Sequence, residues 1–336
     1  MLEPLAATLL AAALLGAALA GCGSGDGANP SADSSPSSQR VTTVVGSAQT
    51  PQEAAVQAQH RSAAPGPGPD LAPLRPREFE RPIAAYRGYA EHQARRMAAS
   101  VARLRSALAA GNLGSARAAW LDSYDDYLLL GAAYGALGEL DEQIDGNPGR
   151  LPGGVHDPEF SGLHRLEYGL WSGESKRSLR APAARLAADV AKLPRRLASL
   201  EITPLDYATR AHEILEDAQR DMLSGVDAPW SGSGLRATAD AAAATEEVMK
   251  TLRPLLAGRG DGLGPVWIEM KEFQRVLAAV RREHGGRWPR LEAMSQGEHE
   301  RVDGALGALL ERLATLPGAL ETEPTPTIPT IEAQEQ

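Results

Sequence analysis

Apolar residues recur three or four positions apart over most of the chain, and they almost never alternate as they would in a strand. Such spacing lines the apolar side chains along one face of a helix, and that face must be covered by another helix. The pattern between residues 77 and 320 therefore predicts an all-α fold. Its clearest stripes are Met97, Val101, Leu104 and Leu108; Leu186, Val190, Leu193, Leu197 and Leu200; Val266, Met270, Phe273, Leu277 and Val280; and Val302, Leu306, Leu309, Leu313 and Leu316.

Several helix ends can be predicted from local residues. Pro194 lies inside the second stripe and should kink or split that helix. Thr203 before Pro204 is typical of a helix N-terminus, and Ser295 with Glu298 forms a capping box. With the Gly-rich loops between stripes, these signals predict about seven or eight helices. One bundle needs fewer, so we expect two packed four-helix bundles, the first over 77–174 and the second over 175–320.

The N-terminal residues predict export and a lipid anchor. The apolar run from Leu5 to Ala20 is too short to span a membrane comfortably, so residues 1–21 are interpreted as a signal peptide. The run ends in Leu-Ala-Gly-Cys, which resembles a lipobox, and Cys22 would then be lipidated and hold the protein extracytoplasmically on the cell membrane. Glu3 stands where a basic residue is expected, so cleavage without lipidation and an uncleaved anchor stay open.

The segments flanking the helical region have the composition of disordered chain. Residues 22–76 are rich in Ser, Gly, Pro and Ala and predict a tether, and residues 321–336 predict a disordered acidic tail. Cys22 is the single cysteine, which excludes an internal disulfide. The net charge of -9, without a stripe of Lys and Arg, argues against a nucleic-acid partner and fits a cation-binding or neutral role better.

The segment from Asp157 to Trp171 is the most informative part of the sequence. If it is helical from about Glu159, its leucines form one apolar face and Glu167 lies on that face. A buried carboxylate needs a partner or a cation, and His164 projects beside it from three positions earlier. Helical bundles build metal sites from such pairs, although the spacing alone fits a simple hydrogen bond more often.

This segment also carries a resemblance to a known family. GLHRLEYGLW closely resembles the His-x-x-Glu signature of the imelysin family, in particular its EfeO or EfeM branch of iron-uptake components. The resemblance extends over residues 116–145, 211–225 and 244–256. It implies two four-helix bundles and the capture of iron for a membrane permease, with a haem-type peroxidase as a further companion.

The sequence departs from the family pattern at several positions. Leu128 and Gly131 stand where the family has carboxylates before the signature, and Gly232 and Gly234 stand where a second pattern has His and Asp. A site with fewer carboxylates would bind its ion more weakly. The remaining candidates for an iron or zinc ion are His164, Glu167, Glu213 and Glu216.

Two further segments resemble metal-binding motifs. The segment His212 to Glu216 looks like a zinc-peptidase helix, but Glu216 stands where the second zinc-binding His is required, so we expect no peptidase activity and no catalytic residue. The acidic stretch with Asp141, Asp145 and Asn147 lacks the spacing of a calcium loop and is better interpreted as a turn. Two functions stay open: a lipoprotein that binds a metal ion, most simply iron, for an uptake system, and a metal-free adaptor of the cell envelope.

Overall fold

The computed structural model describes residues 71–133 and 136–322. The signal peptide, Cys22, most of the tether and most of the acidic tail lie outside these residues, so those predictions stay predictions.

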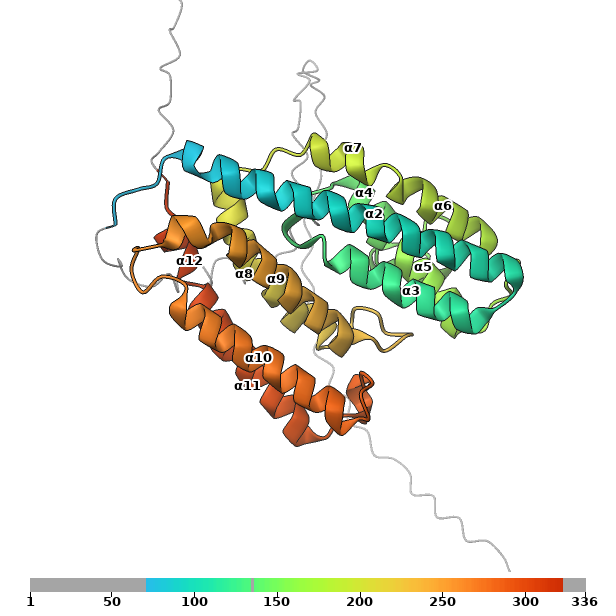
Figure 1. Cartoon of the computed structure of the whole chain (residues 1–336). Helices are drawn as coiled ribbons and strands as arrows, with labels where there is room; N and C mark the ends of the chain where they lie inside the picture. The colour runs from blue at the N-terminus through green and yellow to red at the C-terminus, as the bar shows by residue number, and fades with distance from the viewer. Residues whose placement is uncertain (1–70, 134–135, 323–336) are drawn as a thin grey trace, which may run out of the picture. The chain divides into compact units, whose positions relative to one another are not determined.

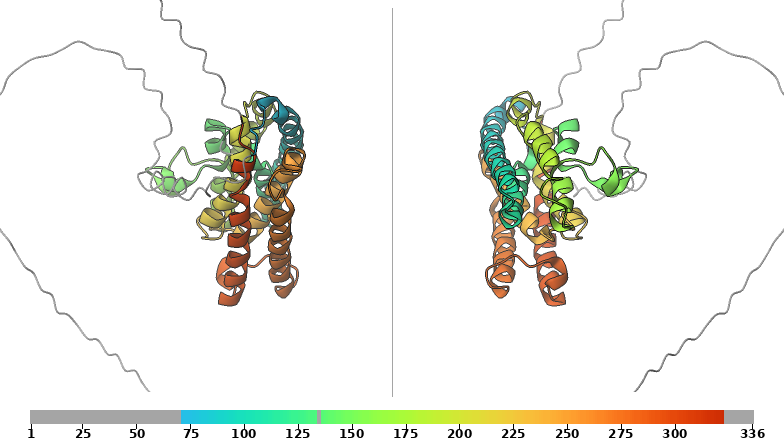
Figure 2. Two further views of the ribbon diagram at one scale, coloured as in Figure 1. Left: turned by 90° about the vertical axis from the view of Figure 1, so that its left-hand side faces the viewer. Right: turned by 90° about the vertical axis from the view of Figure 1, so that its right-hand side faces the viewer.

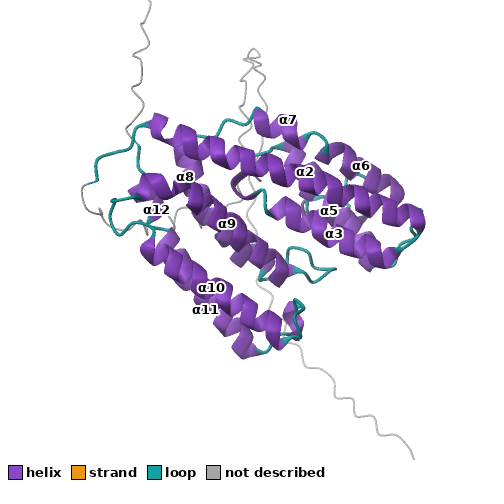
Figure 3. Ribbon diagram, in the orientation of Figure 1, coloured by secondary structure: helices purple, strands orange, loops and turns teal. Residues whose placement is uncertain are grey.

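The described residues form helices joined by loops and turns, with one isolated bridge and no strand among them (Figure 3). The all-α prediction is confirmed. Eight of the described helices have ten or more residues, as expected from the stripes. They are α2 (Glu80–Ala110), α3 (Leu113–Leu128), α5 (Gly162–Trp171), α6 (Arg180–Val190), α8 (Pro204–Asp217), α9 (Gly234–Leu256), α10 (Gly264–Glu283) and α11 (Gln296–Leu313).

Short helical turns connect these eight. The α-helical ones are α4 (Glu139–Asp145), α7 (Leu193–Ala198) and α12 (Leu316–Ala319). A π-helical turn, η5 (Ala218–Met222), continues α8, and the 3-10 turns are η1 (Pro76–Phe79), η2 (Gly131–Ala133), η3 (Pro148–Arg150), η4 (Gly154–His156) and η6 (Leu291–Ala293).

The predicted helix ends agree with the structure. Pro194 splits its stripe, because α6 ends at Val190 and α7 begins at Leu193. The side chain of Thr203 accepts a hydrogen bond from the Asp206 N–H at 3.1 Å, and the capping box of Ser295 and Glu298 is formed. These local signals work because they satisfy the N–H groups that the first helical turn leaves without partners.

The helices pack in two groups (Figures 1 and 2). In the first group α2 contacts α3, α6 and α7, while α5 contacts α3 and α6. In the second group α8 pairs with α9 and α10 with α11, and α9 also contacts α2 and α3. Since α6 and α7 pack on α2, we propose that the boundary between the two bundles falls after α7 rather than after residue 174. The four predicted stripes are buried and belong to one continuous apolar core that spans both groups.

The first and last described segments lie against each other. Leu74 is buried, and its N–H donates to the carbonyl of Glu321 at 2.8 Å. Arg259 donates to the carbonyls of both Ala72 and Ala319 at 2.8 Å. Residues 71–76 and 321–322, which the sequence assigned to the tether and the tail, therefore belong to the helical unit. Within the described ranges no helix is both long and apolar enough to cross a membrane.

Candidate metal centre

The start of α5 is set by a close contact that only glycine allows. The helix begins at Gly162, later than the expected Glu159, because Gly162 has a φ of +80°, which does not fit inside a helix. A Cβ at this position would lie 2.3 Å from the carbonyl oxygen of Ile144. The last turn of α4 therefore lies directly against the first turn of α5, and Asp145 is brought beside His164.

His164 and Glu167 form the contact that their spacing predicted. Nδ1 of His164 lies 3.0 Å from Oε2 of Glu167, and both side chains are buried. The other oxygen of Glu167 accepts the N–H of Ser231 at 2.7 Å, from the loop before α9. The leucines of the predicted apolar face, Leu163, Leu166 and Leu170, are also buried. Glu167 thus holds the imidazole ring in place with one oxygen and the loop with the other.

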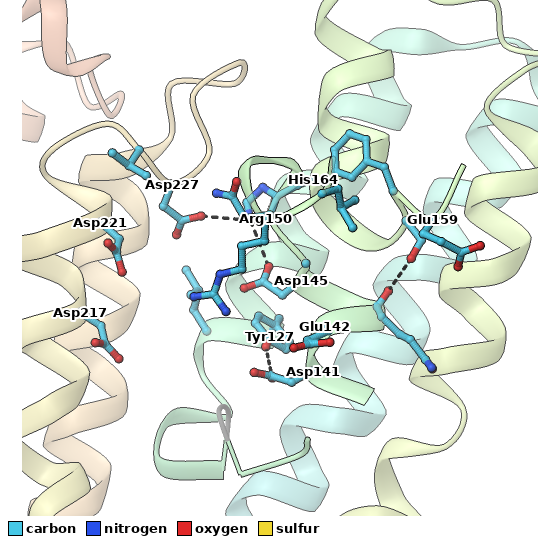
Figure 4. Close-up of a pocket in the computed structure, with 18 of the residues that line it drawn as sticks. Tyr127, Asp141, Glu142, Asp145, Arg150, Glu159, His164, Asp217, Asp221 and Asp227 are labelled. Atoms are coloured by element: carbon cyan, nitrogen blue, oxygen red, sulfur yellow. Dashed lines mark hydrogen bonds and ion pairs between the residues drawn. The ribbon is translucent and has the colours of Figure 1, made fainter. Parts of the chain in front are cut away.

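The second ring nitrogen of His164 faces two more carboxylates. Nε2 lies 3.0 Å from Oδ1 of Asp227 and 3.3 Å from Oδ1 of Asp145 (Figure 4). A single N–H can be directed well at only one of them. Oδ1 of Asp145 is buried, and no hydrogen-bond donor among the described residues satisfies it. The site therefore contains one carboxylate oxygen more than the imidazole N–H groups can donate hydrogen bonds to.

Aromatic side chains of α3 form the wall behind His164. The hydroxyl of Tyr124 donates to Oδ2 of Asp227, and the Tyr124 ring packs edge-on against the His164 ring, with 5.7 Å between centroids. Trp120 stacks on Tyr124 and donates its indole N–H to the carbonyl of Leu163 at 2.8 Å. These contacts fix the orientation of both Asp227 and the helix that carries His164.

Burial and mutual charge shift the pKa values of the site in opposite directions. Burial raises the pKa of Asp145 to about 7, although the facing His164 lowers it. Burial alone would lower the pKa of His164, but Asp145 and the hydrogen bonds to Asp227 and Glu167 raise it well above its usual value. Asp227 is partly buried, which raises its pKa, yet its hydrogen bond to His164 keeps that pKa below the usual value. The surrounding carboxylates therefore favour the imidazolium form of His164, with both ring nitrogens directed at carboxylates.

The site opens into an acidic pocket of about 820 Å³. Eight carboxylates and three arginines line this pocket, so its charge favours cations over anions. The carboxylates are Glu139, Asp141, Glu142, Asp145, Glu159, Asp217, Asp221 and Asp227, and the arginines are Arg150, Arg185 and Arg220. Figure 4 shows Asp227 facing His164 and Asp145, on the same side of the view as Asp217 and Asp221.

The structure brings together only half of the four candidate ligands. Glu213 pairs with Arg210 at 3.0 Å, and Glu216 pairs with His212 at 3.3 Å, both on α8. Neither Glu213 nor Glu216 lines the pocket that contains His164. The prediction that they are ligands is therefore not supported by their position.

The four positions where family ligands are replaced differ in their surroundings. Leu128 lines the pocket, and Gly131 is buried, with a φ of +59°. Gly232 and Gly234 are tightly packed: a Cβ would lie 2.4 Å from Cζ of Arg290 at Gly232 and 2.3 Å from the Met222 carbonyl oxygen at Gly234. At these two glycines the present packing leaves no space for a His or an Asp.

Asp145 and Asp227 were not singled out as ligands from the sequence. The sequence interpretation placed Asp145 in a structural turn; in that acidic stretch Asn147 forms such a turn, accepting the Gly149 N–H at 2.8 Å. Asp227 lies in the loop before α9, where no helical spacing applies. The signal that could have found them is their position: each is an acidic residue at the end of a segment that must pack on α5.

As they stand, the side chains are arranged as ion pairs. Within residues 71–133 and 136–322 no group of three or more His, Cys, Asp or Glu side chains forms a ready metal-binding arrangement. An ion at Nε2 would have to replace the proton there. The residues fit a cation in their chemistry, since an imidazole nitrogen and carboxylate oxygens are ligands of iron and zinc, and Oδ1 of Asp145 has no donor among the described residues.

Comparison with known proteins identifies the family of this arrangement. The sequence profile of the Imelysin family matches residues 82–260, which is more than half of the chain and includes His164, Glu167 and Asp227. The chain belongs to the imelysin family. The resemblance of the His-x-x-Glu segment to the imelysin signature is thereby confirmed.

Curated imelysin-type relatives are named as parts of an iron uptake system. The chain is 24% identical over 239 residues to "Iron uptake system component EfeO" of Escherichia coli (strain K12) and, at the same identity, to that of Shigella flexneri. The match covers 71% of this chain and 63% of each relative, so the chain spans less than two thirds of their length. These relatives are named for iron uptake and not for peptidase activity.

Proposed function

We propose that this imelysin-family chain is an extracytoplasmic lipoprotein that binds an iron ion and delivers it to a membrane uptake system. The observation that carries the proposal is the pair of carboxylate oxygens, from Asp145 and Asp227, facing Nε2 of His164 at 3.3 and 3.0 Å. Neighbouring ligand atoms around a metal bonded at about 2.0–2.1 Å are themselves about 3 Å apart. Each carboxylate oxygen thus lies at the distance from Nε2 that an adjacent ligand would have, and an ion bound there would replace the Nε2 proton.

Glu167 has a different part in this proposal. It contacts Nδ1, the nitrogen on the far side of the ring from Asp145 and Asp227, so it fixes the ring and increases the basicity of Nε2. We therefore propose Asp145, His164 and Asp227 as ligands, with Glu167 as the group that orients His164. Glu213 and Glu216 are left out of the ligand set.

The acidic pocket indicates the form in which the ion arrives. Eight carboxylates against three arginines attract a hydrated ferrous, ferric or zinc cation and disfavour an anionic chelate. The permease and the peroxidase-type partner are proposed from the iron-uptake name of the relatives, and attachment to the membrane is proposed through Cys22. We propose no enzymatic activity, since the His212 to Glu216 segment lacks the second His of a zinc peptidase.

A metal-free adaptor is the second candidate. One observation favours it: Nδ1 and Nε2 of His164 and Oε1 of Glu167 all have partners within the chain. A site satisfied in this way can serve to join α5 to the loop before α9 without an ion. The missing family carboxylates at Leu128 and Gly131 agree with this candidate.

Metal titration separates the two functions. The full chain, purified in detergent, is titrated with Fe²⁺ under anaerobic conditions and with Zn²⁺, and its metal content is measured. The variants are Asp227→Asn, Asp145→Asn and the double variant His164→Ala with Glu167→Ala. The control is Glu142→Gln, a carboxylate that lines the same pocket.

Stoichiometric binding that is lost in the double variant and kept in the control supports ion binding at His164. Binding that is equal in the wild type and the double variant removes the metal function and leaves the adaptor, and the search then turns to protein partners.

A further inference from the structure

The loop before α9 supplies two of the groups around His164 and Glu167. This site loop, residues 225–234, carries the Asp227 carboxylate and the Ser231 N–H. Ala228, directly after Asp227, has a φ of 50°, which residues other than glycine rarely adopt. Such a conformation persists only when surrounding contacts hold it.

Arg290 makes three hydrogen bonds to the backbone of the site loop. Its Nη1 donates to the carbonyls of Ser231 at 2.9 Å and Trp230 at 3.2 Å, and its Nη2 donates to that of Pro229 at 3.3 Å. The guanidinium lies against Gly232, where a Cβ would be 2.4 Å from Cζ. Glycine at 232 is therefore the residue that allows this approach.

The next residue contacts both ends of the same loop. Cδ1 of Leu291 lies 3.6 Å from the Cβ position of Gly225 and 3.3 Å from that of Gly234. Arg290 and Leu291 thus contact the middle and the two ends of the site loop. On its other side Trp230 packs on Tyr168 of α5, with 5.3 Å between ring centroids.

These two residues come from a part of the chain that the site has not involved so far. They lie in the connection between α10 and α11, two helices that run side by side (Figure 1). The family match ends at residue 260, so this connection lies beyond the matched residues. The helix pair after the family domain therefore contacts the loop that completes the site.

We propose that Arg290 is a positioning residue, which holds the site loop so that Asp227 and Ser231 reach His164 and Glu167. The α10–α11 connection then sets how well the ion site is formed. The proposal that Arg290 holds the site loop does not depend on the proposed function. The proposal that Arg290 also affects ion affinity rests on the proposed function.

The test is hydrogen exchange of the metal-free full chain, followed by mass spectrometry on peptides that cover the site loop. Arg290→Ala should speed exchange in this loop by about tenfold, because it removes three hydrogen bonds. Arg290→Lys should have a smaller effect, since an ammonium lacks the planar fork of a guanidinium. Arg287→Ala, an exposed arginine of the same connection, is the matched control.

Gly232→Ala perturbs the same contact from the loop side, because its Cβ would displace the guanidinium, and the φ of +65° adds backbone strain of its own. Arg290→Ala is therefore the variant that isolates the contact. A second readout is the ¹⁵N spectrum of the His164 ring, assigned with His164→Ala. In Arg290→Ala the ring signal should shift as the Asp227 contact loosens. This change would not follow from a loss of stability in α10 and α11 alone.

Loop exchange in Arg290→Ala equal to that of the wild type would overturn the proposal. Faster exchange confined to α10 and α11, with an unchanged His164 signal, would overturn it as well. If the loop responds and Zn²⁺ affinity falls by about tenfold, both proposals are supported. If the loop responds while no form of the chain binds an ion, Arg290 remains a positioning residue and only the proposed function fails.

Discussion

Oδ1 of Asp145 lies 3.3 Å from Nε2 of His164, and it has no other hydrogen-bond donor within the described residues. The same nitrogen is 3.0 Å from Asp227, which receives its proton in the better geometry. In the free protein the single proton on Nε2 of His164 is therefore shared between the carboxylates of Asp145 and Asp227. A cation can bind both carboxylates at the same time. Replacing the Nε2 proton with a cation would therefore satisfy both carboxylates.

Ion affinity should rise with pH. His164 has a pKa well above its usual value and carries a proton on Nε2 that an ion must displace. Asp145, with a pKa of about 7, adds a second displaced proton below that pH. Affinity for Zn²⁺ should rise by about tenfold per pH unit for each proton released. Titration calorimetry in two buffers of different ionisation enthalpy counts the protons, and an affinity independent of pH would contradict the assignment.

Gly162→Ala should damage both the fold and the site. The new Cβ would lie 2.3 Å from the Ile144 carbonyl oxygen, at a φ of +80°. Gly173 has the same φ with nothing within 4 Å of its Cβ position, so Gly173→Ala is the control for backbone strain alone. We expect Gly162→Ala to lower the free energy of unfolding by about 2 kcal/mol more than the control. Equal denaturation curves for the two variants would show that the α4–α5 contact is not tight.

Glu213→Gln and Glu216→Gln should leave ion affinity within about twofold of the wild type, because both carboxylates are paired on α8 away from the pocket. Asp227→Asn should lower the affinity by at least about tenfold. Parallel Zn²⁺ titrations of the three variants check this. A large loss in either glutamate variant would return these residues to the ligand set.

Asp240→Asn should stabilise the protein more strongly as the pH rises. Burial, together with the neighbouring Asp125, raises the pKa of Asp240 to about 8, and its Oδ2 has no donor among the described residues. The folded state keeps a proton that the unfolded state releases, so wild-type stability falls between about pH 4 and about pH 8. The variant should gain up to about 1.4 kcal/mol per pH unit across this window. The free energy of unfolding of both proteins is measured by urea unfolding at several pH values. A difference between variant and wild type that stays constant over this window would contradict the prediction.

Residues close in sequence were predicted well. The stripes of α2, α10 and α11 follow from helical spacing, and the His164 and Glu167 contact follows from a separation of three positions within one helix. Both depend on the geometry of a single helix, which the sequence specifies directly.

Contacts between distant segments were not predicted. Asp145 reaches His164 only because Gly162 adopts a positive φ, and Asp227 reaches it through a loop whose path depends on α5 and on Arg290. Glu213 and Glu216 remained as candidates after the other family positions proved to be replaced, but the sequence does not say which face of α8 meets the pocket. The side chains that complete the site are set by tertiary packing.

The hydrogen bond between Leu74 and Glu321, with Arg259 contacting both segments, places the two ends of the helical unit side by side. A short linker could therefore join residue 71 to residue 322 with little strain, and new termini could be opened in an exposed turn such as the one at Gly173. The unit is thus suited to circular permutation, or to insertion as a whole into a surface loop of a reporter protein.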